Sequence, residues 1–459
     1  MNPRRLRDAA PLAAVVAIAF AVRIAWDVYA RWRPTINDDA GRYDFLARSL
    51  VDGLGYINPN GNPTMFWPPG WPFLLALIYR LSPERLVGDH QLQAALAVNA
   101  ALGALTVALV YALARRAFDR TTALVAAALV ALTPSLVIYA GTTLSETAFI
   151  AITLTGLWLW VEAEHRRDLL WTAAGALLIG YAALVRGQAA LLPLVAVPFW
   201  FAATRDARAT ALRSALALAL TCAVIAPWAW RNYDESGALV LISSNAGVDF
   251  YIGHSDGATG AGRKVDDLVF RYPDLPPAEA EARVNRDGFR KGLAYAVRHP
   301  LRELTLSARK LWHLYARDDE AVGWADAHGE RHVFGDAERL AWRALADVYY
   351  WLLLVLAAIG AITTLRSTTS RQRVDTTGGP TRRRVPDDRR PTTDDRRPTQ
   401  ILLASLVVYW TLVHVAFFGD PRFHAPILPV IAIAAAAGIT TLLRQGTNAP
   451  APADPAPND

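Results

Sequence analysis

Residues 9–29 read AAPLAAVVAIAFAVRIAWDVY, an apolar run as long as a helix that crosses a lipid bilayer. Three arginines (Arg4, Arg5 and Arg7) precede the run, and no small-residue cleavage pattern follows it. We therefore interpret it as an uncleaved membrane anchor. Hydrophobic residues make up 53% of the 459 positions and charged residues only 19%, with a mean hydropathy of +0.20. This composition argues against a soluble domain.

Further apolar runs predict about ten membrane-spanning helices in all. They lie near residues 9–30, 91–114, 121–140, 145–163, 169–185, 188–203, 212–230, 343–364, 400–418 and 424–443. The shorter segment PPGWPFLLALIYRL at 68–81 favours an interfacial or re-entrant helix. The expected fold class is an all-α polytopic membrane protein with juxtamembrane helices in its outer loops.

Arginines in alternate loops predict the orientation in the cell membrane. They are Arg115, Arg116, Arg120, Arg166, Arg167, Arg205, Arg208, Arg213, Arg444 and the ten arginines of 365–399. The positive-inside rule then places both termini in the cytoplasm. Two long loops, about 31–90 and 231–342, are left on the outer face. The second contains an amphipathic stretch at 300–316 and a Pro-rich start at 273–277 that predicts a loop followed by a helix.

The chain divides into a catalytic core at 1–364, a linker at 365–399, two last spans at 400–443 and a tail at 444–459. The linker holds the near-repeat DDRRPT twice and lacks apolar periodicity, so we expect a disordered, solvated tether; the tail should also be disordered. The net charge of +6 does not indicate nucleic-acid binding, because positive-inside topology explains most of the arginines. The single cysteine, Cys222, excludes a disulfide framework and is expected to be a buried hydrophobe.

Two acids directly after the first span are the first candidates for chemistry. The sequence NDDAGRYDFLARSLVDGLGY at 37–56 places Asp38 and Asp39 at the start of a predicted helix. Asp39, Tyr43 and Ala47 share one face of that helix, and Tyr43 is a candidate substrate-binding residue. The alternative is that the two carboxylates only cap the helix.

Three more polar residues stand at the outer ends of predicted spans. Glu146 lies in TLSE, Arg186 in LVRG and Arg422 in GDPRFHAPILP. Helix capping is the alternative for Glu146, and snorkelling is the alternative for Arg186. Arg422 is harder to explain in this way, because a cation in a short outer loop suggests a paired anion such as a lipid phosphate.

The loop at 226–260 is rich in glycine and carries Asn245 and His254, which are candidate substrate-binding residues; loop packing is the alternative for His254. Its glycine spacing matches neither a Walker nor a dinucleotide motif, so a nucleotide site is not expected.

Together these pieces resemble the GT-C membrane glycosyltransferases, in particular the branch of protein O-mannosyltransferases and lipid A aminoarabinose transferases. Four stretches carry the resemblance, in the expected order: Asp39–Tyr43 with LARSL and GLGY, then PPGWPFLLAL, TLSE and PRFHAPILPVIAIAAA. The resemblance as a whole covers about residues 9–443, without the linker. The sequence departs from the family in having Asp-Asp where Asp-Glu is frequent, and His254 where Asn is common.

The resemblance implies a polyprenyl-phosphate sugar donor, membrane lipids as surroundings and an acceptor that approaches from outside the cytoplasm. It also implies that an acid of the first outer loop is the general base, which fits Asp39 better than Asp38. A single displacement would invert the sugar, Arg422 and Arg186 would stabilise the departing phosphate, and Glu146 would orient the acceptor or the sugar.

Other readings stay open. Adjacent Asp side chains diverge by about 100° on a helix, so a divalent metal is possible only if Glu146 or His254 joins them. A transporter or flippase of a lipid-linked sugar is the main alternative function. Transporters usually carry polar residues near mid-membrane, whereas the polar residues here collect at one face. A polymerase or ligase would share the outer-face chemistry.

Overall fold

The computed structural model describes residues 3–82, 89–375 and 393–447, and within these ranges the regular structure is helical, with isolated β-bridges. The predicted all-α membrane fold is confirmed. Residues 448–459 of the predicted tail and residues 376–392 of the predicted linker lie outside the described residues, whereas residues 444–447 of that tail are helical. The helices on either side extend into the predicted linker, one to Asp375 and the other from Thr393. The disordered tether stays a prediction.

Seven helical segments of the described chain are long and apolar enough to cross a membrane, and each overlaps a predicted span. They belong to α1 (Pro3–Ala30), α4 (His90–Ala117), the η1–α9–α10 series (Gly187–Leu191, Leu192–Val195, Val197–Thr204), α11 (Ala207–Ser236), α17 (Asp336–Asp375), α18 (Thr393–Ala416) and η2 with α19 (Pro421–Ile427, Leu428–Thr447). The chain is therefore a multi-pass membrane protein.

The other three predicted spans are helical but differ in kind. The helices α5 (Arg120–Leu132) and α6 (Pro134–Ala140) form one possible crossing, bent by 56° where Pro134 has no backbone N–H to continue the ladder. Next come α7 (Glu146–Arg166) and α8 (Leu169–Val185), a 17-residue helix. The total of ten crossings stays a prediction.

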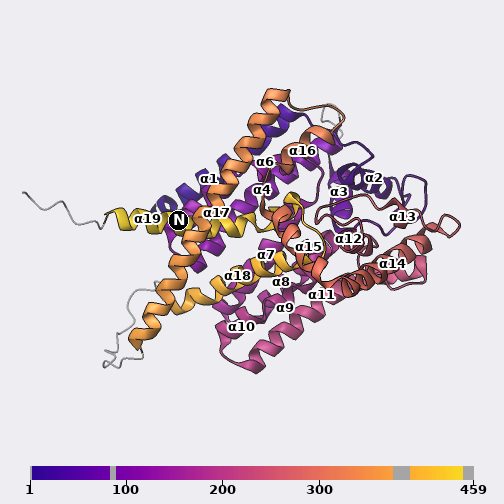
Figure 1. Cartoon of the computed structure of the whole chain (residues 1–459). Helices are drawn as coiled ribbons and strands as arrows, with labels where there is room; N and C mark the ends of the chain where they lie inside the picture. Colours follow the sequence, from indigo (N-terminus) through magenta and orange to yellow (C-terminus); the bar gives the residue numbers. More distant parts are fainter. Residues whose placement is uncertain (1–2, 83–88, 376–392, 448–459) are drawn as a thin grey trace, which may run out of the picture.

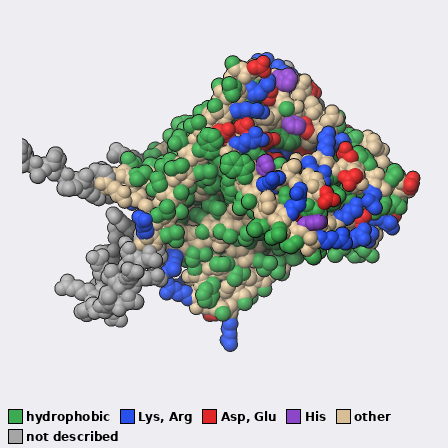
Figure 2. Space-filling model, viewed as in Figure 1, with side chains coloured by type: hydrophobic (Ala, Val, Ile, Leu, Met, Phe, Trp, Pro, Cys, Tyr) green, Lys and Arg blue, Asp and Glu red, His purple; other side chains and the backbone are tan. Residues whose placement is uncertain are grey.

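Short helices from the two outer loops gather at one end of the bundle. Figure 1 shows them opposite the N-terminus and the C-terminal end of α19. They include α2 (Asp39–Val51), α3 (Gly70–Leu81), α12 (Ala246–Gly253), α13 (Asp266–Val269) and α14 (Pro277–Arg298). Charged and histidine side chains cover much of this end, whereas hydrophobic side chains cover the bundle (Figure 2). The α3 helix has 12 residues, too few to cross a bilayer, as its short apolar run predicts.

Two residues of the spans differ from expectation. Cys222 is exposed on α11 and is not a buried hydrophobe.

Arg23 lies inside the first span, 1% exposed, and donates to Ala19 O at 2.9 Å and Ala131 O at 3.3 Å. Ala131 O lies at the bend between α5 and α6, where Pro134 interrupts the helical ladder. Arg23 therefore supplies a hydrogen bond where the helix is broken.

Candidate active site

The start of α2 gives the two neighbouring acids different surroundings. Asp38 is the N-cap: its carboxylate accepts from Gly41 N and from Thr35 Oγ1, both at 3.0 Å, and its side chain is 6% exposed. Only a glycine fits at position 41, because a Cβ there would lie 1.6 Å from Thr35 O. The capping alternative therefore describes Asp38, and the tight turn leaves Asp39 free to face elsewhere.

Asp39 faces the loop before the last span. Its Oδ2 lies 2.9 Å from Arg422 Nη1, and its Oδ1 accepts a hydrogen bond of 3.3 Å from Trp67 Nε1. The Asp39 side chain is 41% exposed, whereas that of Arg422 is 7% exposed. Two hydrogen-bond donors therefore fix the Asp39 carboxylate, which stays partly exposed.

Glu146 lies between two arginines. Its Oε1 accepts from Arg186 Nη2 and from Arg422 Nε, and Arg186 Nε donates to Ser145 Oγ at 3.0 Å. The Glu146 side chain is fully buried, so its charge depends on these two partners. The four residues Asp39, Glu146, Arg186 and Arg422, which we call the ion cluster, come from α2, α7, the α8 end and η2.

The ion cluster balances two carboxylates against two guanidinium groups. Burial alone would raise the pKa of Asp39, but the charge of Arg422 and the hydrogen bonds from Arg422 and Trp67 outweigh it and lower the pKa. Asp39 is therefore anionic at neutral pH. Arg422 also lies over the ring of Trp324, 4.5 Å from its centroid, which fixes the guanidinium from a further side.

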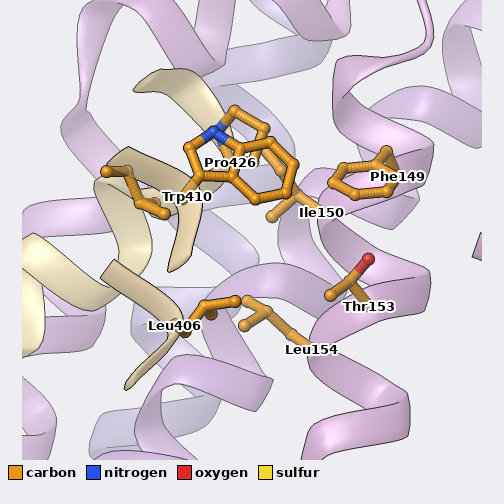
Figure 3. A pocket seen from close by; sticks show the side chains of 8 residues that line it. Phe149, Ile150, Thr153, Leu154, Leu406, Trp410 and Pro426 are labelled. Carbon is orange, nitrogen blue, oxygen red and sulfur yellow. The ribbon is translucent and has the colours of Figure 1, made fainter. Parts of the chain in front are cut away.

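An apolar layer closes the membrane side of the ion cluster. Figure 3 shows a cavity one turn along α7 from Glu146, between Phe149 and Ile150 of that helix, Leu406 and Trp410 of α18, and Pro426 of η2. Its volume is about 10 Å³, room for a single water molecule. Asp39, with 41% of its side chain exposed, is the most accessible member of the ion cluster.

Two further residues belong to the surroundings of the ion cluster. Tyr43 is 6% exposed, and burial followed by the charge of Asp39 raises the pKa of its hydroxyl. Asp249 on α12, which sequence reasoning missed, has a pKa raised to about 7 by burial and by repulsion from Asp39. Nothing in the sequence around Asp249 indicates that it lies close to Asp39. The same holds for Trp67 and Trp324, whose contacts with the ion cluster also appear only in the structure.

Asn245 and His254 are not brought into the ion cluster. Asn245 Oδ1 accepts from Ser243 Oγ at 2.7 Å, within its own loop. His254 contacts Ala416 O at 2.8 Å through Nε2 and Glu303 Oε2 at 2.9 Å through Nδ1. Their substrate-binding roles stay predictions. Among the described residues, no group of three or more His, Cys, Asp and Glu side chains is placed to hold a metal ion.

A comparison with protein families finds a match to part of the chain. Residues 67–230 match the family model described as dolichyl-phosphate-mannose-protein mannosyltransferase. The matched region includes Trp67, Glu146 and Arg186 but neither Asp39 nor Arg422. No curated protein matches the chain by sequence.

Solved structures extend the comparison to almost the whole chain. The oligosaccharyltransferase of Archaeoglobus fulgidus in its apo form matches with a TM-score of 0.55 and 14% identity, over 95% of this chain and 50% of that chain. The same enzyme, AglB, in complex with an inhibitory peptide and a dolichol-phosphate, gives 0.51 and 15% over the same shares. ArnT from Cupriavidus metallidurans bound to undecaprenyl phosphate gives 0.39 and 17%, over 91% and 78%.

The chain has the GT-C fold of membrane glycosyltransferases, as the sequence resemblance predicts. The fold assignment rests on the two archaeal structures, whose TM-scores exceed 0.5. This chain spans about half the length of the archaeal enzyme.

Proposed function

We propose that this protein is an inverting glycosyltransferase that moves a sugar from a polyprenyl-phosphate donor to an acceptor hydroxyl at the outer face of the membrane. The observation that carries the proposal is the ion cluster, in which an accessible carboxylate stands against two buried arginines at the loop end of a GT-C bundle. The dolichol-phosphate in the complex of the archaeal AglB supports a lipid phosphate as the donor's leaving group.

Asp39 is the general base in this proposal. The acceptor oxygen attacks the anomeric carbon, its proton passes to Asp39, and the bond between that carbon and the phosphate oxygen breaks with its electron pair leaving on the phosphate. The lowered pKa of Asp39 keeps it ionised and ready to accept, although it makes the carboxylate a weak base. A donor phosphate that engages Arg422 would weaken the Arg422–Asp39 pair and make Asp39 more basic.

Arg422 and Arg186 stabilise the phosphate as its charge develops. Both guanidinium groups share Glu146 Oε1, so Glu146 holds two cations together at one place. Apolar side chains around Phe149 line the neighbouring part of the bundle, and a low dielectric there strengthens these interactions. Glu146 is thereby proposed to orient the arginines as well as the substrate.

The outer-face location rests on the arginines of alternate loops, which put the ion cluster on the side opposite both termini. The transporter alternative would be favoured by ionisable groups exposed along a path through the bundle. Arg23, the buried arginine of the first span, instead donates hydrogen bonds to two backbone carbonyls, so it does not favour the transporter.

An assay with purified protein separates the two functions. The protein in detergent is given polyprenyl-phosphate sugars with the sugar radiolabelled, together with peptide, lipid and glycan acceptors. A glycosyltransferase releases polyprenyl phosphate and labels one acceptor without a membrane to cross. Movement of intact donor across vesicles, with no released polyprenyl phosphate for any pair, would contradict the proposal and support the transporter.

A further inference from the structure

His424 lies two residues after Arg422 in η2 and is fully buried. Both of its ring nitrogens are in contact with oxygen atoms. Nδ1 lies 2.6 Å from Leu314 O, and Nε2 lies 2.9 Å from Asp318 Oδ1. The ring also stacks on Tyr350, with centroids 4.6 Å apart and planes 8° from parallel. His424 therefore has one fixed orientation.

A carbonyl oxygen can only accept a hydrogen bond, so the contact with Leu314 O requires a proton on Nδ1. A carboxylate also only accepts, which requires a second proton on Nε2. We propose that His424 is held as an imidazolium ion by Leu314 O and the Asp318 carboxylate. We call these two contacts the clasp and propose that the clasp positions Arg422. Asp318 is 3% exposed, and a carboxylate so deeply buried needs a cation beside it.

The carbonyl group of Leu314, which contacts His424, does not accept the usual hydrogen bond of its own helix. Leu314 lies in the last turn of α15 (Pro300–Tyr315), where its helical partner would be Asp318 N. That N–H donates instead to Asp347 Oδ1 at 2.7 Å. The imidazolium replaces the missing donor, and a positive charge at a helix C-terminus is favourable.

Several titratable groups lie around His424. They are Asp318 after α15, Tyr315 at the end of α15, Asp347 and Tyr350 on α17, His414 on α18, and Asp420 just before η2. The cation Arg422 lies two residues before His424 in η2.

His424 lies only two residues after Arg422, so holding His424 in place also holds Arg422 in place. His424 and Arg422 share the seven-residue 3-10 helix η2, whose start is fixed by Asp420 Oδ1 accepting from Arg422 N at 2.9 Å. Trp410 Nε1 donates to Phe423 O, between the two residues, at 2.6 Å. His424 anchors the other side of this turn to α15. It is a positioning residue, and its effect on activity rests on the proposed function.

The protonation state can be measured without any assumption about activity. Of the nine histidines, only His424 follows a phenylalanine, so labelling with carbonyl-¹³C phenylalanine and ¹⁵N histidine identifies it in the unaltered protein. Solid-state NMR of that protein in lipid bilayers at neutral pH then reports both ring nitrogens. We expect both to be protonated. An unprotonated Nε2, with the proton on Asp318 instead, would overturn the proposal.

Two variants complete the test. Asp318→Asn keeps a polar side chain but removes the charge, and we expect His424 to become neutral at the same pH. In His424→Gln we expect the turnover of donor to fall by on the order of tenfold to a hundredfold because Arg422 shifts, with the KM for acceptor unchanged. The matched control is His299→Gln, an exposed histidine between α14 and α15. Unchanged turnover in His424→Gln would overturn the positioning role, and inactive unaltered protein would count against the proposed function alone.

Discussion

Arg422 Nη1 lies 2.9 Å from Asp39 Oδ2, although the two residues are 383 positions apart in the chain. This contact joins the loop after the first span to the loop before the last. Through Nε of the same guanidinium, Arg422 also contacts Glu146, which Arg186 holds from the far side. One side chain therefore links the accessible acid to the buried part of the ion cluster.

Arg422→Lys is expected to lower the rate of transfer by on the order of a hundredfold. A lysine ammonium is a point charge and cannot reproduce the separate contacts that Nε and Nη1 make with Glu146 and Asp39. The measurement is the release of polyprenyl phosphate at saturating donor. The control is Arg290→Lys on α14, whose side chain is 72% exposed. Equal rates in the two variants would count against a role for the guanidinium.

Glu146→Gln is expected to destabilise the fold by about 3–5 kcal/mol, because the buried arginines Arg186 and Arg422 lose the carboxylate they share and only Asp39 remains to balance their two charges. A thermal unfolding curve in detergent should show a midpoint lower by several degrees. Glu235→Gln, which breaks a 3.7 Å pair at the surface, should change it little. A midpoint as high as that of the unaltered protein would show that the arginines do not need the Glu146 charge.

Asp249 predicts a pH dependence of stability. Its pKa is about 7 in the folded protein, against an ordinary value of 3.8. Between these values the folded protein binds a proton that the unfolded chain does not, so stability falls as the pH rises from 3.8 to about 7. Asp249→Asn removes this dependence and should unfold at a higher temperature than the unaltered protein above pH 7. The check is the unfolding midpoint measured across this pH range, where parallel curves would argue against the raised pKa.

The sequence predicts the membrane fold well because apolar length and arginine placement are local properties. It also singles out Asp39, Glu146, Arg186 and Arg422 one at a time, since each is a polar residue at the outer end of an apolar run. That Arg422 bridges Asp39 and Glu146 depends on how the helices pack, which no local pattern contains.

Other parts of the site could not be predicted from sequence. Trp67 lies in an irregular segment, and Asp249 and Trp324 lie on short helices of the second outer loop, so their contacts with the ion cluster form only in the folded protein. His254 contacts Glu303 and Ala416, two partners that its glycine-rich loop does not reveal. His424 lies in the same motif as Arg422 but carries no sequence signal of its own, because its partners lie 106 and 110 positions away in the chain.

Asp38 and Asp39 differ in role although they are neighbours. Asp38→Asn is expected to keep transfer within about tenfold of the unaltered rate, because asparagine is as good an N-cap as aspartate. Asp38→Ala should lose the cap and about 1 kcal/mol of stability. Thermal unfolding and transfer assays on the two variants separate capping from chemistry, and an inactive but stable Asp38→Asn would assign the base to Asp38.

The most direct test of the central claim is the rate of polyprenyl-phosphate release by Asp39→Asn, compared with Asp38→Asn in the same membranes. The substitution at Asp39 retains the size of the side chain and removes its ability to take a proton, so we predict a loss on the order of a hundredfold to ten-thousandfold. Protein yield should stay unchanged, and the unfolding midpoint should fall by less than in Glu146→Gln, because the Asp39 side chain is 41% exposed and Arg422 keeps Glu146 as a partner. Transfer by Asp39→Asn at the unaltered rate would contradict the assignment of Asp39 as the general base.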